Sequence, residues 1–114
     1  MAIFKATDAF AVEAYRVSRL LSGPESGGLA QEIRRTALCA GGAVVATSAS
    51  EPGGVEERRQ LERARSALIE GRYYLYLARR FGLLDRRRYH ALTVRQDAAL
   101  RELEQLLAPG AASA

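Results

Sequence analysis

The chain has 114 residues, of which 48% are apolar and 26% are charged, so it is long enough for one folded domain and too apolar for a disordered segment. Sixteen of its seventeen basic residues are arginine, and only Lys5 is lysine. The formal net charge of +4 permits an anionic partner without requiring one.

Three features of the sequence indicate the cellular compartment of the protein. Cys39 is the only cysteine, so no internal disulfide can form and a reducing environment is expected. The first residues lack the charged and then apolar pattern of a signal peptide. The longest uncharged run, 36–50, falls short of the about 20 residues that span a bilayer. We therefore expect a soluble, cytoplasmic protein that does not contact a membrane.

Turn-forming residues divide the chain into four segments, with breaks at 22–28, 51–54, 82–85 and 109–110. Between the breaks, apolar residues recur at helical spacing. We predict helices at roughly 8–22, 28–49, 55–81 and 86–107, in a bundle domain over 1–108 with a flexible tail over 109–114. The short joints favour an all-α, antiparallel up-down-up-down four-helix bundle.

Local signals mark the ends of these helices. Thr7 or Asp8 is expected to cap the first helix, and Asp85 the fourth. Gly82 suits the left-handed position that closes the third helix.

The third helix carries two apolar surfaces. One is a seam in which large and small residues each repeat every seven positions: Leu61, Leu68 and Leu75 with Ala64, Gly71 and Ala78. The other, which we call the outer patch, consists of Ile69, Tyr73, Tyr76 and Leu77. A second apolar face on a bundle helix indicates a subunit interface. The alternative is that this helix lies centrally within a monomer.

A heptad row of arginines also runs along the third helix. This arginine row consists of Arg58, Arg65, Arg72 and Arg79, and Arg86 to Arg88 extend it past the turn. Such a row can hold a nucleic-acid backbone, and we predict contacts from its four members with Arg86 and Arg87. The alternatives are a solvated flank, partly neutralised by a Glu62–Arg65 pair, or salt bridges between subunits. No aromatic residue is interleaved in the row, so base stacking is not expected there.

Other polar residues are expected to be structural. Glu70 lies on a mostly apolar helix, and a buried carboxylate must be paired, so we predict an ion pair with Arg34 or Arg35. His90 is the only histidine and is expected near the surface at the start of the fourth helix. With Cys39 expected as a buried thiol, the ligands for a metal or a catalytic triad are lacking. We expect no enzyme activity and no cofactor.

Three motifs give a family resemblance: Gly28-Leu29-x-x-x-Ile33-Arg34-Arg35-Thr36-Ala37, Ala64-x-Ser66-Ala67-Leu68-x-Glu70, and Phe81-Gly82-Leu83-Leu84. From Phe4 to Leu107 the chain resembles the four-helix bundle family named after a protein encoded in intervening sequences of bacterial 23S ribosomal RNA genes. That family also includes the accessory variability protein of diversity-generating retroelements.

The resemblance implies a homopentameric barrel. For the retroelement branch it also implies binding to a reverse transcriptase and to nucleic acid, without catalysis by the protein itself. Where the family usually reads Ile-Pro-Ala-Asn-Ile-Ala-Glu-Gly, this chain has residues 40–47, with Ala43 and Ala46 in place of Asn and Glu. The roles of those polar groups do not transfer, and the divergence favours the accessory-protein branch over the ribosomal-RNA branch.

Overall fold

The computed structural model describes residues 1–21, 23 and 26–109, and within them it contains four α-helices and no strand. The helices are α1 (Ala2–Ser18), α2 (Gly27–Ala46), α3 (Val55–Arg80) and α4 (Arg86–Leu107). A short 3-10 turn, Thr47–Ala49, continues α2. The chain is therefore all-α, as the sequence predicts. None of the helices described has a stretch long and apolar enough to cross a membrane.

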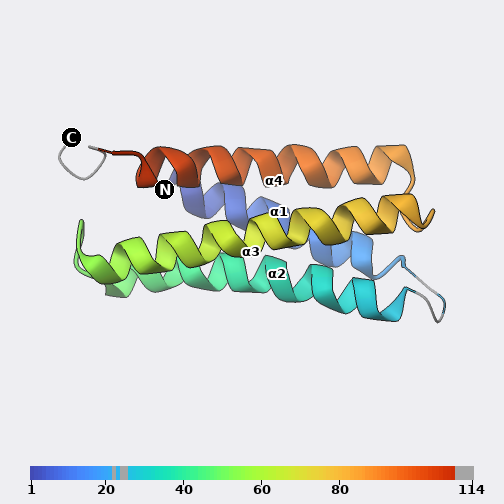
Figure 1. Cartoon of the computed structure of the whole chain (residues 1–114), viewed down its shortest axis with the longest axis horizontal. Helices are drawn as coiled ribbons and strands as arrows, with labels where there is room; N and C mark the ends of the chain where they lie inside the picture. Colours follow the sequence, from blue (N-terminus) through green and yellow to red (C-terminus); the bar gives the residue numbers. More distant parts are fainter. Residues whose placement is uncertain (22, 24–25, 110–114) are drawn as a thin grey trace.

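The helices form an elongated bundle of 48 × 21 × 18 Å. In it, α1 packs against α2 and α4, and α3 packs against the same two helices. The α2–α3 connection lies at the end where α1 begins and α4 ends (Figure 1). At the opposite end α1 finishes, α2 begins and the α3–α4 turn lies (Figure 1). Each described connection thus joins helices that are neighbours in the bundle.

The predicted start of the first helix is wrong, because α1 begins at Ala2 and ends at Ser18 instead of covering 8–22. Thr7 is not a cap but lies inside the helix, where its hydroxyl donates to the Ile3 carbonyl over 2.9 Å. Ile3 and Phe10 are seven residues apart and both buried, so the apolar stripe continues to the first turn. Of the predicted tail, residues 110–114 lie outside the described part of the chain, as does Ser22.

The turn between α3 and α4 confirms both predicted end signals. Gly82 has φ +76°, and its N–H and that of Leu83 donate to Arg79 and Ala78 over 3.1 and 2.9 Å. This pattern is the left-handed closing turn that glycine favours after a helix. Asp85 then accepts the Arg88 backbone N–H over 2.8 Å and caps α4.

The core runs along the inner faces of all four helices. Every member of the predicted α3 seam is buried: Leu61, Ala64, Leu68, Gly71, Leu75 and Ala78. The other helices contribute apolar residues at helical spacing, among them Phe10, Ile33, Leu92 and Leu103. With this seam turned inward, the arginine row lies on the flank of α3 and the outer patch on its exposed side.

Candidate nucleic-acid interface

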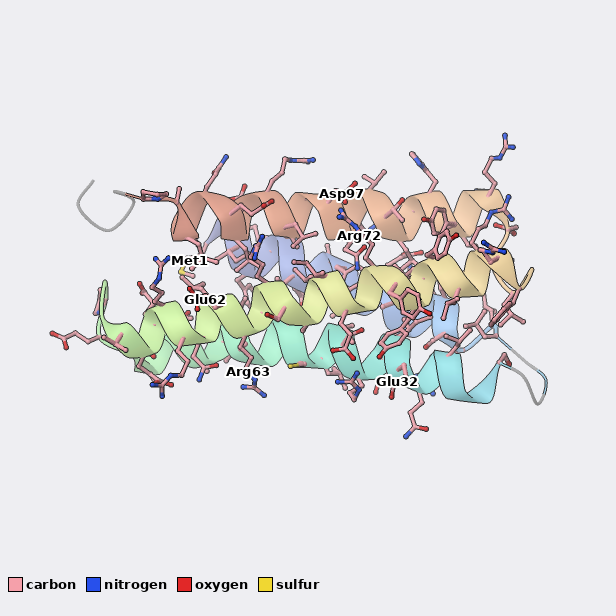
Figure 2. The ribbon with its side chains drawn as sticks, viewed as in Figure 1. Met1, Glu32, Glu62, Arg63, Arg72 and Asp97 are labelled. Atoms are coloured by element: carbon pink, nitrogen blue, oxygen red, sulfur yellow. The ribbon has the colours of Figure 1, made fainter. Side chains whose placement is uncertain are left out.

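The middle of the arginine row lies against α4 and is paired there. Arg72 Nη2 lies 2.5 Å from Asp97 Oδ1, and Figure 2 shows the two side chains meeting between α3 and α4. Arg65 Nη2 lies 3.9 Å from Glu104 Oε2, one heptad earlier in α3. These two arginines therefore face carboxylates of the neighbouring helix and are not isolated cations.

The ends of the row also have partners. Arg58 lies 3.3 Å from Glu62 Oε1, one turn along α3. The Glu62–Arg65 pair considered for a solvated flank is not formed, because Arg65 lies near Glu104 of α4 and Glu62 pairs with Arg58. Arg79 donates to the Leu84 carbonyl over 3.1 Å and holds the α3–α4 turn.

Two shallow hollows of about 430 and 300 Å³ follow one another along the α3–α4 groove and share Arg65 and Glu104 in their walls. Their charged lining consists of Arg58, Arg65, Arg72 and Arg101 with Glu62, Asp97 and Glu104. Four guanidinium groups thus face three carboxylates. The groove is close to electrically neutral, which weakens its attraction for a polyanion.

The positive charge is concentrated instead at the α3–α4 turn, in residues 79–88, which we call the basic tip. It contains five arginines and one acidic residue: Arg79, Arg80, Arg86, Arg87, Arg88 and Asp85. Its formal charge of +4 equals that of the whole chain, so the other residues are neutral in sum. The basic tip is therefore the strongest site for an anion on electrostatic grounds.

All six charged side chains of the basic tip are exposed. Arg88 pairs with Asp85 over 3.0 Å, and Arg80 donates to the Tyr76 hydroxyl over 3.0 Å. Arg86 and Arg87 make neither an ion pair nor a side-chain hydrogen bond with any described residue. The predicted contact set does not include Arg80 or Arg88, although Arg88 belongs to the extension of the arginine row and the density of arginines in these ten residues marks both.

A second polar cluster joins α2 to α3. Arg35 donates to Glu70 and, over 2.8 Å, to Glu32, while the Tyr74 hydroxyl donates to Glu70 over 2.6 Å. These bonds, first that from Tyr74 and then that from Arg35, lower the pKa of the Glu70 carboxyl. The hydrogen bond to Glu70 also raises the pKa of the Tyr74 hydroxyl, because the phenol must stay protonated to donate this bond.

Of the two arginines predicted as alternative partners of Glu70, Arg35 pairs with it, and the cluster departs from the prediction only in its exposure. The Glu70 side chain is 44% exposed and not buried. Arg34 is not its partner but donates to Ser18 Oγ over 2.7 Å, with its guanidinium 5.6 Å from the centre of the Tyr15 ring. Successive helical residues are about 100° apart, so the Arg34–Arg35 pair divides between α1 and α3.

The remaining candidates lie at the surface. In the outer patch, Ile69, Tyr73 and Tyr76 are exposed and Leu77 is half-buried. His90 is exposed in α4. Cys39 was predicted to be buried, but it is only half-buried. In the described ranges, no three His, Cys, Asp or Glu side chains lie close enough together to hold a metal ion.

No protein-family model matches the chain, and neither a curated protein nor a solved structure matches it. The resemblance noted from the sequence motifs therefore remains a hypothesis.

Proposed function

We propose that this protein is a non-catalytic accessory protein that binds the phosphate backbone of RNA or DNA through the basic tip. The observation that carries this proposal is the concentration of the whole net charge of +4 in residues 79–88. Arg86 and Arg87 have no partner among the described residues, so they are open to an incoming phosphate.

The chemistry of arginine supports phosphate as the ligand. Its guanidinium is always charged and offers a planar fork of donors that matches phosphate oxygens. Binding gains free energy from counterion release, which needs clustered positive charge but no base contact. Within the predicted contact set, the arginines of the basic tip contribute most to phosphate binding, and these are Arg79, Arg86 and Arg87. Arg58, Arg65 and Arg72 contribute less because each already lies near a carboxylate.

Self-association completes the proposal. We place the chain in an antiparallel up-down-up-down bundle that assembles through the outer patch, and the family resemblance implies a homopentameric barrel. Several copies would present several basic tips to one strand, and such multivalency raises the affinity without any new contact. In this proposal the barrel presents the strand to a partner enzyme such as a retroelement reverse transcriptase. Any catalysis then belongs to that partner.

The second candidate is a protein-binding or self-assembling bundle with no nucleic-acid role. It is favoured by the pairing of Arg65 with Glu104 and of Arg72 with Asp97, since the same charges could pair between copies. In that case the α3–α4 groove is the contact surface, and the basic tip is a solvated end of the bundle.

Fluorescence anisotropy with labelled 20-nucleotide RNA and DNA tests the first candidate against the second. The test variant is Arg86→Glu with Arg87→Glu. The matched control, Arg59→Glu with Arg63→Glu, makes the same change in net charge on α3, where Figure 2 shows Arg63 pointing out of the bundle.

We expect the tip variant to weaken binding by about tenfold or more and to reduce the slope of log Kd against log salt by about two. The control should change both much less. Binding that is independent of salt, or equally sensitive to both double variants, would contradict the proposal.

A further inference from the structure

Phe81 is an aromatic side chain that the bundle does not use. It follows the last residue of α3 and is 62% exposed, whereas Leu84 in the same turn is 1% exposed. The core is therefore closed at this end by Leu84, and the Phe81 ring is left in contact with water. Exposing a large aromatic ring has a free-energy cost that a ligand can recover by covering it.

The ring lies within the basic tip. Arg79 and Arg80 precede it directly, and Arg86 and Arg87 follow on the other side of the turn. The backbone under the ring is fixed by the bonds from Gly82 and Leu83 back to α3 and by the bond from Arg79 to the Leu84 carbonyl. An exposed aromatic ring on a fixed turn among arginines combines a stacking surface with phosphate contacts.

Neighbouring aromatic residues are less suited to this role. The guanidinium of Arg80 lies 5.8 Å from the centre of the Tyr76 ring, so one face of that ring is already covered. Tyr74 is tied to Glu70 through its hydroxyl. Phe81 has no polar group that would hold it in another contact.

We propose that Phe81 stacks against an unpaired base, so that the basic tip prefers single-stranded to double-stranded nucleic acid. This inference rests on the proposed function. Arginines alone bind the backbone of either form, but a duplex keeps the faces of its bases covered. Single-strand binding proteins combine a basic surface with an aromatic stacking surface in the same way.

The test uses a 20-nucleotide oligothymidine strand and a 20-base-pair duplex, measured by anisotropy at one salt concentration. Phe81→Ala is compared with Phe4→Ala, which removes the same side chain from an exposed position in the first turns of α1, at the other end of the bundle. We expect Phe81→Ala to weaken single-strand binding about tenfold and to leave duplex binding unchanged. Phe4→Ala should change neither.

A third variant reports on stacking itself. The chain has no tryptophan, so Phe81→Trp would be the sole source of indole fluorescence. We expect the single strand to quench it and the duplex to quench it much less.

Single-strand binding that Phe81→Ala leaves unchanged, while Arg86→Glu with Arg87→Glu abolishes it, would overturn the stacking role and leave the proposed function in place. Failure of both oligonucleotides to bind would overturn both. A blue shift of the tryptophan on vesicles of phosphatidylserine and phosphatidylcholine, without oligonucleotide binding, would instead make the tip a membrane contact.

Discussion

Gly71 of α3 packs directly against Thr36 of α2, since a methyl group added at Gly71 would lie 2.8 Å from Thr36 Oγ1. Thr36 is 1% exposed and donates its hydroxyl to the Glu32 and Ile33 carbonyls of its own helix. Its burial and these two bonds hold the hydroxyl in place. This contact shows why the small position of the α3 heptad is glycine at the centre of the bundle.

The first prediction concerns this contact. Gly71→Ala raises helix propensity by about 1 kcal/mol, but crowding in a packed core costs about 1–3 kcal/mol. We therefore expect a net loss of about 1 kcal/mol in the free energy of unfolding, measured by urea denaturation. Combined with Thr36→Ala, the loss should be smaller than the sum of the two single changes, because the colliding hydroxyl is gone.

Gly42→Ala is the matched control. A methyl group there would meet nothing within 4 Å, so it should raise the free energy of unfolding by about 0.5–1 kcal/mol. A stabilised Gly71→Ala protein would show that α2 and α3 can separate without loss.

The second prediction concerns the neutralised groove. Asp97→Asn with Glu104→Gln removes the carboxylates that face Arg72 and Arg65. The freed guanidinium groups can then bind phosphate. If the proposed function holds, we expect the affinity for a labelled oligonucleotide to rise and the slope of log Kd against log salt to steepen by about one to two. Unchanged affinity and slope would show that the α3–α4 groove lies outside the path of the strand.

Sequence periodicity predicted the helices and the core well, because a heptad of Leu61, Leu68 and Leu75 with small residues between them has one stable position, turned inward. It could not predict the partners of the arginine row. Whether Arg65 meets Glu62 or Glu104 depends on how α3 is rotated relative to α4, and Glu104 is 39 residues distant in sequence.

The candidate site could be predicted only in part, because the sequence pattern does not show which arginines lie far from carboxylates. Arg79, Arg86 and Arg87 were identified as members of a row, yet what sets them apart is the absence of nearby carboxylates other than Asp85 in residues 79–88. Phe81 belongs to a sequence motif, but its exposure follows from the geometry of the closing turn around Gly82 and is not visible in the sequence.

The third prediction is a pH dependence. The pKa of the Glu70 carboxyl is lowered from its ordinary value of 4.5 in the folded protein, so the unfolded chain binds this proton more readily. The ionised Glu70 carboxylate, bonded to Arg35 and Tyr74, therefore stabilises the fold above pH 4.5. This contribution is lost as the pH falls through the pKa of Glu70 in the folded protein. Glu70→Gln should lower the thermal midpoint at pH 7, and its difference from the parent should shrink at about pH 3.

Glu51→Gln, in the α2–α3 connection, serves as the control and should shift the midpoint little at either pH. An unchanged midpoint for Glu70→Gln at pH 7 would show that the bonds from Arg35 and Tyr74 do not stabilise the fold.

The fourth prediction tests the outer patch as the surface of self-association. Ile69→Ser with Tyr73→Ser changes two side chains that are 44% and 57% exposed, so the protomer should keep its helical circular dichroism. We expect sedimentation velocity to show a shift from an oligomer towards the protomer mass of 12.4 kDa. The control, Leu38→Ser with Val45→Ser, changes equally exposed residues of α2 and should leave the oligomer intact. A parent protein that sediments as a protomer would contradict self-association itself.

The fifth prediction concerns Gln96, a fully buried polar residue in α4. Its Nε2 donates to the Leu68 carbonyl of α3 over 2.9 Å, but its Oε1 has no hydrogen-bond partner among the described residues. An unpaired buried acceptor costs about 1–3 kcal/mol, which offsets the single bond that the amide makes. Gln96→Leu should therefore be neutral or stabilising by up to about 1 kcal/mol, because Leu68 keeps the backbone bond that the α-helix provides.

Gln96→Glu keeps the volume of the side chain but is expected to destabilise the fold. It places a carboxylate in the core, and an unpaired buried charge destabilises by about 3 kcal/mol or more. Since the buried carboxyl binds its proton more readily than the unfolded chain does, this loss should be recovered as the pH falls through the raised pKa of the folded protein, and the recovery should be complete by about pH 4. Urea denaturation at pH 7 and in acid measures both variants. A Gln96→Leu protein that lost about 2 kcal/mol or more would contradict this prediction and show that the amide stabilises the contact between α3 and α4 despite its unpaired Oε1.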